Sequence, residues 1–219
     1  GFSALSSDIS SLIKYTGRVG VLVDGEAVVL RPGTVELFGF DGSKRQPRYV
    51  SVDWSVQQAS KLGYPHYLRK EIEEEPEAIH GLINSVRSAE PDIRQFIQSR
   101  KVNKVVFVAC GSASFSGAFA SILARRWRLP LDVVSDIGSE FRYVPMRVDN
   151  RSLLVAISQS GETADTLRAV DHAEATGASI MSFVNVVGSS LERCCDCSVR
   201  LAAGPEIAVP STKAVMNQF

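Results

Sequence analysis

The chain has 219 residues, of which 45% are hydrophobic and 22% charged, and its 24 basic residues balance 24 acidic ones. This balance gives no electrostatic reason to expect nucleic acid or an anionic membrane as a partner. No apolar run approaches the roughly 20 residues of a membrane-spanning helix, and the first residues lack the basic-then-apolar order of a signal peptide, so we expect a cytoplasmic protein.

The first 64 residues have a β-rich pattern. The apolar runs that we expect to form strands are residues 19–23, 26–30, 34–40 and 49–52. The pair Asp24-Gly25 joins the first two runs and is typical of a β-hairpin turn, so we expect these two strands to pair. The strands are too few to close a sandwich, and residues 1–64 are therefore predicted to be a small β-rich segment.

Residues 65–100 have helical periodicity and are predicted to be a linker followed by helices. We expect a run of five glutamates to form a solvated helix face: Glu71, Glu73, Glu74, Glu75 and Glu77. Pro76 is expected at a helix break or start. A further helix is predicted near residues 91–99, with Pro91 in its first turn.

From residue 101 to residue 219 the pattern alternates between strands and helices. The expected strands are residues 105–109, 131–134, 153–157, 180–184 and 199–202, and the clearest helices are residues 115–127 and 162–175. The strands are continuous Val/Ile/Leu runs without polar alternation, which favours a parallel sheet that is covered on both faces. The predicted fold class is α/β, a three-layer αβα sandwich preceded by the β-rich segment.

Three polar turns follow predicted strands or open predicted helices. They are Cys110-Gly111-Ser112-Ala113-Ser114, the residues from Ser158 to Thr163, and Pro210-Ser211-Thr212-Lys213. Ligands bind at the carboxyl ends of strands in such sheets, so we expect the three turns to converge on one site.

The middle turn carries the most chemical information. Ser158, Ser160 and Thr163 place three hydroxyls at a helix start, and Gly161 is expected to let the backbone approach a ligand closely. The free N–H groups and positive dipole end of the helix would solvate a phosphate without any basic side chain. A purely structural role remains open, with Ser160 as an N-cap and Ser158 as a turn former. Glu162 is expected in the first helical turn, where it complements the dipole.

Other signals for catalysis or cofactors are weak. Neither a Walker loop nor a G-x-G-x-x-G fingerprint occurs, so we expect no nucleotide cofactor. A metal site at Cys194, Cys195 and Cys197 is conceivable, but the spacing favours small apolar fillers, and no metal is predicted. No catalytic role is expected for the three histidines: His66, His80 and His172.

These motifs, in this order, resemble the first sugar isomerase (SIS) domain of the glutamine–fructose-6-phosphate aminotransferase family over residues 66–219. The similar stretches are residues 106–111, 139–143, 158–166, 185–191 and 209–214. Earlier stretches are similar to the closing strands of the glutaminase domain of that family and to the following linker: Ser7-Asp8, Tyr15-Thr16, residues 21–26 and residues 66–72. The resemblance implies a flavodoxin/Rossmann-like SIS fold after a glutamine amidotransferase remnant.

The resemblance also implies which residues bind a sugar phosphate. Phosphate contacts are implied for Ser158, Gln159, Ser160 and Thr163, sugar contacts for Val209 and Ser211, and a place at the hydroxyl end of the sugar for Cys110, Gly111 and Ser112. The family commonly has a hydroxyl residue where Ala113 stands, so Ser112 or Ser114 would have to replace that contact. Lys213 resembles a family lysine at a helix start, for which we expect no Schiff-base role.

The implied function is to hold fructose 6-phosphate or glucosamine 6-phosphate for an enzyme that makes glucosamine 6-phosphate with ammonia from glutamine. The glutaminase cysteine and the second SIS domain, which holds the acid/base residues of the family, are absent from these residues. We therefore predict no catalytic residues here, no activity of the chain alone, and partners that include the missing portions and a second copy. A sugar-phosphate deaminase or deglycase and a non-catalytic sugar-phosphate sensor remain alternatives.

Overall fold

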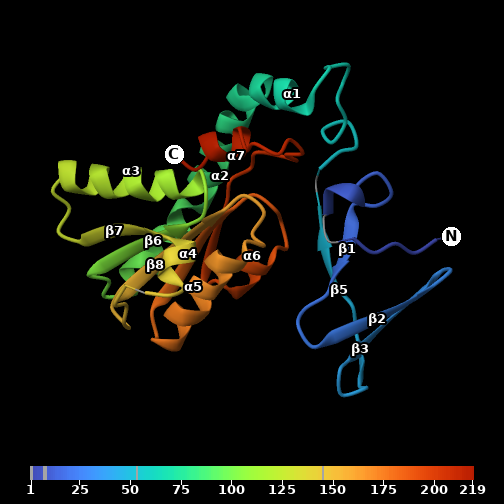
Figure 1. The fold of residues 1–219 in the computed structure, drawn as a ribbon, viewed down its shortest axis with the longest axis horizontal. Coiled ribbons are helices and arrows are strands. Elements are labelled where there is room, and N and C mark those ends of the chain that lie inside the picture. Colours follow the sequence, from blue (N-terminus) through green and yellow to red (C-terminus); the bar gives the residue numbers. More distant parts are fainter. Residues whose placement is uncertain (1, 7–8, 53, 145) are drawn as a thin grey trace. The chain divides into compact units, whose positions relative to one another are not determined.

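The computed structural model describes residues 2–6, 9–52, 54–144 and 146–219. Contacts divide the chain into two compact units, Gly1–Gly63 and Tyr64–Phe219, and each is described by itself (Figure 1). Ser7 and Asp8, which the family resemblance includes, lie outside the described residues. None of the described helices has both the length and the apolar character needed to cross a membrane.

The Gly1–Gly63 unit contains a short 3-10 helix and two small antiparallel sheets. The helix is η1 (Ile9–Ser11), one sheet pairs β1 (Arg18–Val21) with β5 (Arg48–Ser51), and the other is β2 (Glu26–Arg31), β3 (Thr34–Gly39) and β4 (Lys44–Arg45). The expected strands at residues 34–40 and 49–52 are confirmed as β3 and β5. A small core of Ile13, Val19 and Val52 is buried beside them.

The predicted hairpin around Asp24-Gly25 is wrong. A turn does form, because the N–H of Glu26 donates to the carbonyl of Val23 (3.2 Å) and Gly25 has a φ of +79°. The strands on either side of the turn nevertheless belong to different sheets. β2 pairs instead with β3 across Pro32-Gly33, where proline followed by a glycine with positive φ fits a type II turn.

Five parallel strands form the sheet of the Tyr64–Phe219 unit, which confirms the predicted α/β class. Their order is β10 (Cys197–Arg200), β9 (Ser179–Val184), β8 (Ser152–Ser158), β6 (Lys104–Ala109) and β7 (Asp132–Ile137). If the five strands are numbered 1 to 5 along the chain and read from the β7 edge, their order is 2-1-3-4-5, which is the flavodoxin-like arrangement. The direction of winding reverses between β6 and β8, which places a crevice at their carboxyl ends.

Helices cover both faces of this sheet, as predicted for a three-layer sandwich. α2 (Glu75–Gln98) and α3 (Ala113–Arg126) lie on one face, and α4 (Gly138–Phe141), α5 (Ala164–Ala175) and α6 (Ser190–Cys194) lie on the other (Figure 1). All seven residues of β8 are buried. Successive β8 side chains belong to different core clusters: Leu154 lies in one cluster and Val155 in the other. A strand buried on both sides explains the continuous apolar run in the sequence.

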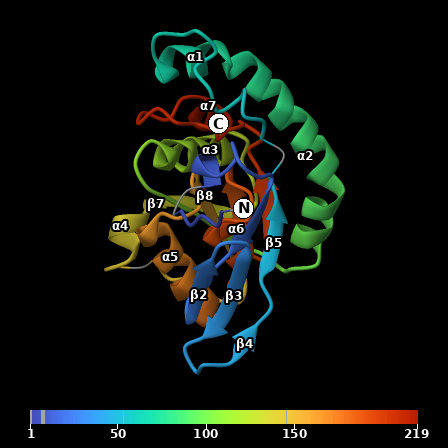
Figure 2. The ribbon, with the colours of Figure 1, turned by 90° about the vertical axis from the view of Figure 1, so that its right-hand side faces the viewer.

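The helices before the sheet differ from the prediction at Pro91. α1 (Tyr67–Glu73) ends next to α2, and Pro76 lies in the first turn of α2, as expected. Pro91, however, lies inside α2, which continues to Gln98 as one long helix (Figure 2). Ile93 and Phe96, which follow Pro91 in the helix, pack against the core of the sheet. These tertiary contacts offset the backbone hydrogen bond that the proline cannot donate, so the helix continues past it.

The three clustered cysteines have different environments. Cys195 packs against the core cluster beneath α5, and Cys197 packs against the cluster on the opposite face of the sheet, as expected for small apolar fillers. Cys194 is exposed and does not fit that expectation. Among the described residues, no group of three or more His, Cys, Asp or Glu side chains is close enough to hold a metal ion.

Candidate functional site

A cleft of about 170 Å³ lies at the carboxyl ends of β6 and β8, where the winding of the sheet reverses. Its lining residues are Cys110, Ser112, Ala113, Ile157, Ser158, Gln159, Ser160, Thr163, Ser211, Val215 and Gln218. All three polar turns singled out in the sequence contribute to this wall. None of the lining residues carries a charged side chain.

The turn after β8 supplies hydroxyl donors to the cleft. The Ser158 hydroxyl accepts the N–H of Gly161 (3.0 Å) and lies 3.2 Å from the Thr163 hydroxyl. Only one hydroxyl can donate across that contact, so the other keeps its proton for a ligand. The Ser160 hydroxyl accepts the N–H of Glu162 (3.1 Å), and no described residue accepts its proton. The turn therefore offers two O–H donors to a bound group.

The amino end of α5 faces the same turn. The N-cap residue is Thr163, and its side chain caps no backbone N–H, so the first-turn amides of α5 remain for a ligand or water. Ser160 is therefore not the N-cap of this helix. Asp165 in the first turn would repel an anion, but it pairs with Arg142 (3.1 Å).

One expectation about this turn needs correction. Glu162 precedes α5 instead of lying in its first turn, and its carboxylate accepts the N–H of Ser190 at the start of α6 (2.8 Å). Gly161 has a φ of +70°, and a Cβ atom there would lie 2.2 Å from the Ser189 hydroxyl. The glycine is thus required by backbone conformation and by packing inside the protein, and its close approach to a ligand stays a prediction.

The turn after β6 places some of its predicted residues in the cleft. Cys110, Ser112 and Ala113 line the wall, whereas Gly111 does not. The Ser114 hydroxyl donates to the carbonyl of Gly111 (2.7 Å) and is not part of the lining. Ser112 is therefore the residue that can supply a hydroxyl beside Ala113.

The third turn lies before α7 (Lys213–Met216) and contributes Ser211 but not Val209. The Val209 side chain is fully exposed. The Ser211 hydroxyl donates to Glu206 (2.7 Å), and the same carboxyl group accepts the N–H of Thr212 (2.7 Å). Because its proton is used in this way, Ser211 can only accept a hydrogen bond from a ligand.

Part of the acidic run supports this third turn, so the prediction of a solvated face is wrong for Glu71 in α1 and for Glu74 between α1 and α2. Glu71 is buried, and its carboxylate accepts the N–H groups of Ile207 (2.6 Å) and Ala208 (3.1 Å). Glu74 accepts a hydrogen bond from Lys213 (2.8 Å), whose side chain is only 3% exposed. The two carboxyl groups hold amide and ammonium groups of a distant segment, which no local pattern reveals.

The pKa of Glu74 reflects this pairing. Burial alone would raise the pKa, but hydrogen bonds and charges from Lys213 and Lys70 together outweigh it and hold the pKa below the ordinary value of 4.5. Glu74 is thus a carboxylate, and Lys213 is fixed between Glu74 and the carbonyl of Pro205 (3.0 Å). Lys213 does not line the cleft.

Three cleft residues were not predicted from the sequence: Ile157, Val215 and Gln218. Ile157 ends the buried β8 run, so its place beside Ser158 could have been inferred. Val215 and Gln218 reach the cleft only because α7 follows the third turn, and no sequence motif marks them.

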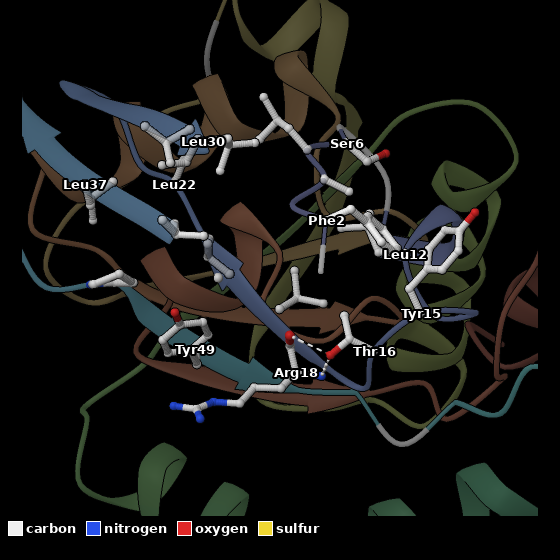
Figure 3. Close-up of a pocket in the computed structure, with 18 residues that line it drawn as sticks. Phe2, Ser6, Leu12, Tyr15, Thr16, Arg18, Leu22, Leu30, Leu37 and Tyr49 are labelled. Atoms are coloured by element: carbon white, nitrogen blue, oxygen red, sulfur yellow. Dashed lines mark hydrogen bonds between the residues drawn. The ribbon is translucent and has the colours of Figure 1, made fainter. Parts of the chain in front are cut away.

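A larger pocket of about 420 Å³ lies in the Gly1–Gly63 unit (Figure 3). Its wall is mostly apolar and includes Leu12, Leu30 and Leu37. The Thr16 hydroxyl, one of its few polar groups, is bonded to the backbone of Arg18 (3.1 and 3.0 Å). The one charged side chain in this wall is that of Arg18, whose guanidinium group stacks on the Tyr49 ring (4.1 Å). The smaller cleft, which gathers the hydroxyl donors at the strand ends, is therefore the candidate site for a phosphate.

Comparison with known proteins decides the family. Residues 99–219 match the family described as SIS domain. The chain belongs to the SIS domain family. The matched SIS residues contain every strand of the parallel sheet and all three turns of the cleft.

The chain is also a homologue of several aminotransferases. Proteins named glutamine–fructose-6-phosphate aminotransferase [isomerizing] are 36% identical in Fusobacterium nucleatum, 38% in Thermotoga maritima and 40% in Streptomyces coelicolor. These alignments cover 98–100% of the chain, including its β-rich unit, but only 36–37% of each relative. The chain therefore spans a little over a third of the length of these relatives.

Solved structures agree with this assignment. The C-terminal domain of glucosamine-fructose-6-phosphate aminotransferase from Francisella tularensis is 36% identical with a TM-score of 0.65, over 73% of this chain and 46% of that one. A putative phosphosugar isomerase from Silicibacter pomeroyi is 28% identical with a TM-score of 0.61, over 69% of this chain and 46% of that one.

Proposed function

We propose that the SIS cleft of this chain binds a sugar phosphate, with fructose 6-phosphate and glucosamine 6-phosphate as its ligands. The phosphate would lie against Ser158, Gln159, Ser160 and Thr163. The observation that carries the proposal is the pair of unused O–H donors beside the uncapped amino end of α5. A phosphate dianion accepts hydrogen bonds only, so such a wall matches it without basic side chains.

The sugar would extend from this phosphate toward the turns after β6 and before α7. Cys110, Ser112 and Ser211 line that part of the cleft and can contact hydroxyl groups. Gly111 and Val209 do not line the cleft, and for them the proposal is limited to backbone contacts.

We propose further that the chain is part of a glutamine–fructose-6-phosphate aminotransferase. The Gly1–Gly63 unit would be the end of a glutamine amidotransferase domain, and a second copy would pair through the SIS domain. The alignments with such aminotransferases, which cover 98–100% of this chain, support this proposal. The parent enzyme would make glucosamine 6-phosphate for amino-sugar synthesis, and a cytoplasmic location stays a prediction.

A titration of the purified chain tests the ligand. Calorimetry with fructose 6-phosphate, glucosamine 6-phosphate and inorganic phosphate should show binding of all three. Ser160→Ala and Thr163→Val should each weaken binding of all three ligands by about 1–3 kcal/mol, because each removes a hydrogen bond to a charged group.

Ser88→Ala is the matched control, since Ser88 is an exposed serine on α2. It should leave every affinity unchanged. Unchanged affinities in both cleft variants would place the phosphate elsewhere and contradict the proposal.

A further inference from the structure

Gln218 has an unusual environment in the cleft. It follows α7, and its backbone N–H donates to the carbonyl of Val215 (3.0 Å). Its side chain lines the cleft together with the hydroxyl turn. Both polar atoms of this side chain, Oε1 and Nε2, are buried and have no hydrogen-bond partner among the described residues.

The neighbouring amide of Asn217 differs from Gln218 in part: its Oδ1 is also buried without a partner among the described residues, but its Nδ2 is bonded. Nδ2 of Asn217 donates to the carbonyls of Ala78 (2.9 Å) and Leu201 (2.7 Å), which ties α7 to the core. Asn217 therefore has a structural role that explains its burial. Gln218 has no such bonds, so the described residues leave both its donor and its acceptor unused.

A buried amide without partners lowers the stability of the protein that carries it, and an apolar side chain of similar shape would avoid this cost. The unused amide is therefore most simply explained by a bound group that supplies the missing partners. An amide offers a donor and an acceptor together. A phosphate dianion can satisfy only the donor, whereas a hydroxyl group can satisfy both.

We propose that Gln218 binds a hydroxyl group of the sugar, accepting from it through Oε1 and donating to it through Nε2. This inference rests on the proposed function, and it adds a residue that binds the sugar and not the phosphate. Gln218 and Ser211 would then act together, because Ser211 can only accept from the sugar whereas Gln218 can also donate.

The test is Gln218→Met, which keeps the length of the side chain and removes both polar atoms. Calorimetry should show that the dissociation constant for fructose 6-phosphate rises about ten-fold to a hundred-fold, as expected for two lost hydrogen bonds between neutral groups. The dissociation constant for inorganic phosphate should stay unchanged. The melting temperature of the ligand-free variant should be equal to or higher than that of the wild type, because the unsatisfied amide is gone.

Gln98→Met on α2 is the matched control, since Gln98 is an exposed glutamine outside the cleft, and all three values should stay unchanged. The inference is overturned if Gln218→Met leaves fructose 6-phosphate binding intact or weakens both ligands equally. A variant that unfolds or melts earlier also overturns it, because the amide would then be structural. If the wild type binds no sugar phosphate, the proposed function itself fails.

Discussion

Ala113 marks the place where this cleft differs from the family that it resembles. It is buried in the wall, at a position where the family resemblance implies a hydroxyl residue. The adjacent Ser112 lines the cleft, and no described residue bonds to its hydroxyl, whereas Ser114 is turned toward the carbonyl of Gly111. We infer that Ser112 takes over the contact that Ala113 cannot make.

Exchanging the two side chains tests this inference. Ser112→Ala should weaken fructose 6-phosphate binding by about 0.5–1.5 kcal/mol, the usual value of one neutral hydrogen bond, and leave inorganic phosphate binding unchanged. Adding Ala113→Ser to that variant should restore part of the loss. Calorimetric titration measures both changes. Equal losses for the two ligands would show that Ser112 acts on the phosphate or on the fold.

At the scale of single residues, the sequence predicted the part of the cleft that is local. Ser158, Ser160 and Thr163 are close in the chain, so a single turn brings them together. Glu206 and Gln218 could not be predicted in this way, because their roles depend on how the third turn and α7 fold against the sheet. A lone glutamine or glutamate carries no pattern that distinguishes a buried role from an exposed one.

At the scale of elements, buried charges connect α1 with α7. Lys213 is 3% exposed and pairs with Glu74, which also pairs with Lys70. Lys213→Met should lower the free energy of unfolding by about 1–3 kcal/mol, because it leaves a partly buried carboxylate with Lys70 as its remaining partner. Urea unfolding followed by circular dichroism measures this loss.

Arg94→Met provides the comparison, because Arg94 and Glu90 form an exposed pair on α2. Its effect should stay below about 1 kcal/mol. If the two variants were equally stable, the burial of Lys213 would have no energetic consequence.

The same carboxylate predicts a pH dependence. The pKa of Glu74 is lowered in the folded protein, so below the ordinary value of 4.5 the unfolded chain binds more protons than the folded one. Its contribution is complete above that pH and is lost as the pH falls through the lowered value. The difference in unfolding free energy between wild type and Glu74→Gln should therefore be constant near neutral pH and shrink in acid. A difference that grew on acidification would contradict the assignment.

Elements held by tertiary contacts were the ones that the sequence pattern mispredicted. Asp24-Gly25 forms a turn, but β2 pairs with β3, which offers it six paired positions. Pro91 does not begin a helix, because Ile93 and Phe96 anchor α2 beyond it. The buried parallel strands were predicted well, since burial on both faces leaves a continuous apolar run that needs no knowledge of the neighbours.

At the scale of the whole molecule, the cleft is equipped for binding and lacks groups for proton transfer. Its described lining contains no carboxyl, imidazole or amine side chain. Converting fructose 6-phosphate to an amino sugar requires general acid–base groups near the reacting carbons. We therefore expect the 219 residues to bind the ligand without turnover. Incubation with fructose 6-phosphate and glutamine, followed by an assay for glucosamine 6-phosphate, tests this, and product above background would contradict it.

The uncharged wall of the cleft also determines how binding should respond to ionic strength. A site built from lysine and arginine loses affinity for an anion as salt is added, because screening shortens the reach of its field from about 10 Å at 0.1 M to about 3 Å at 1 M. Here the lining has no such cations and the chain has a formal net charge of zero, so under the proposed function oriented dipoles would hold the phosphate. Sodium chloride over that range should change the dissociation constant of fructose 6-phosphate by less than about three-fold, and a steep loss would reveal hidden cations. Capture of the sugar phosphate would accordingly be an unsteered diffusional encounter, equally rapid in dilute and in concentrated salt.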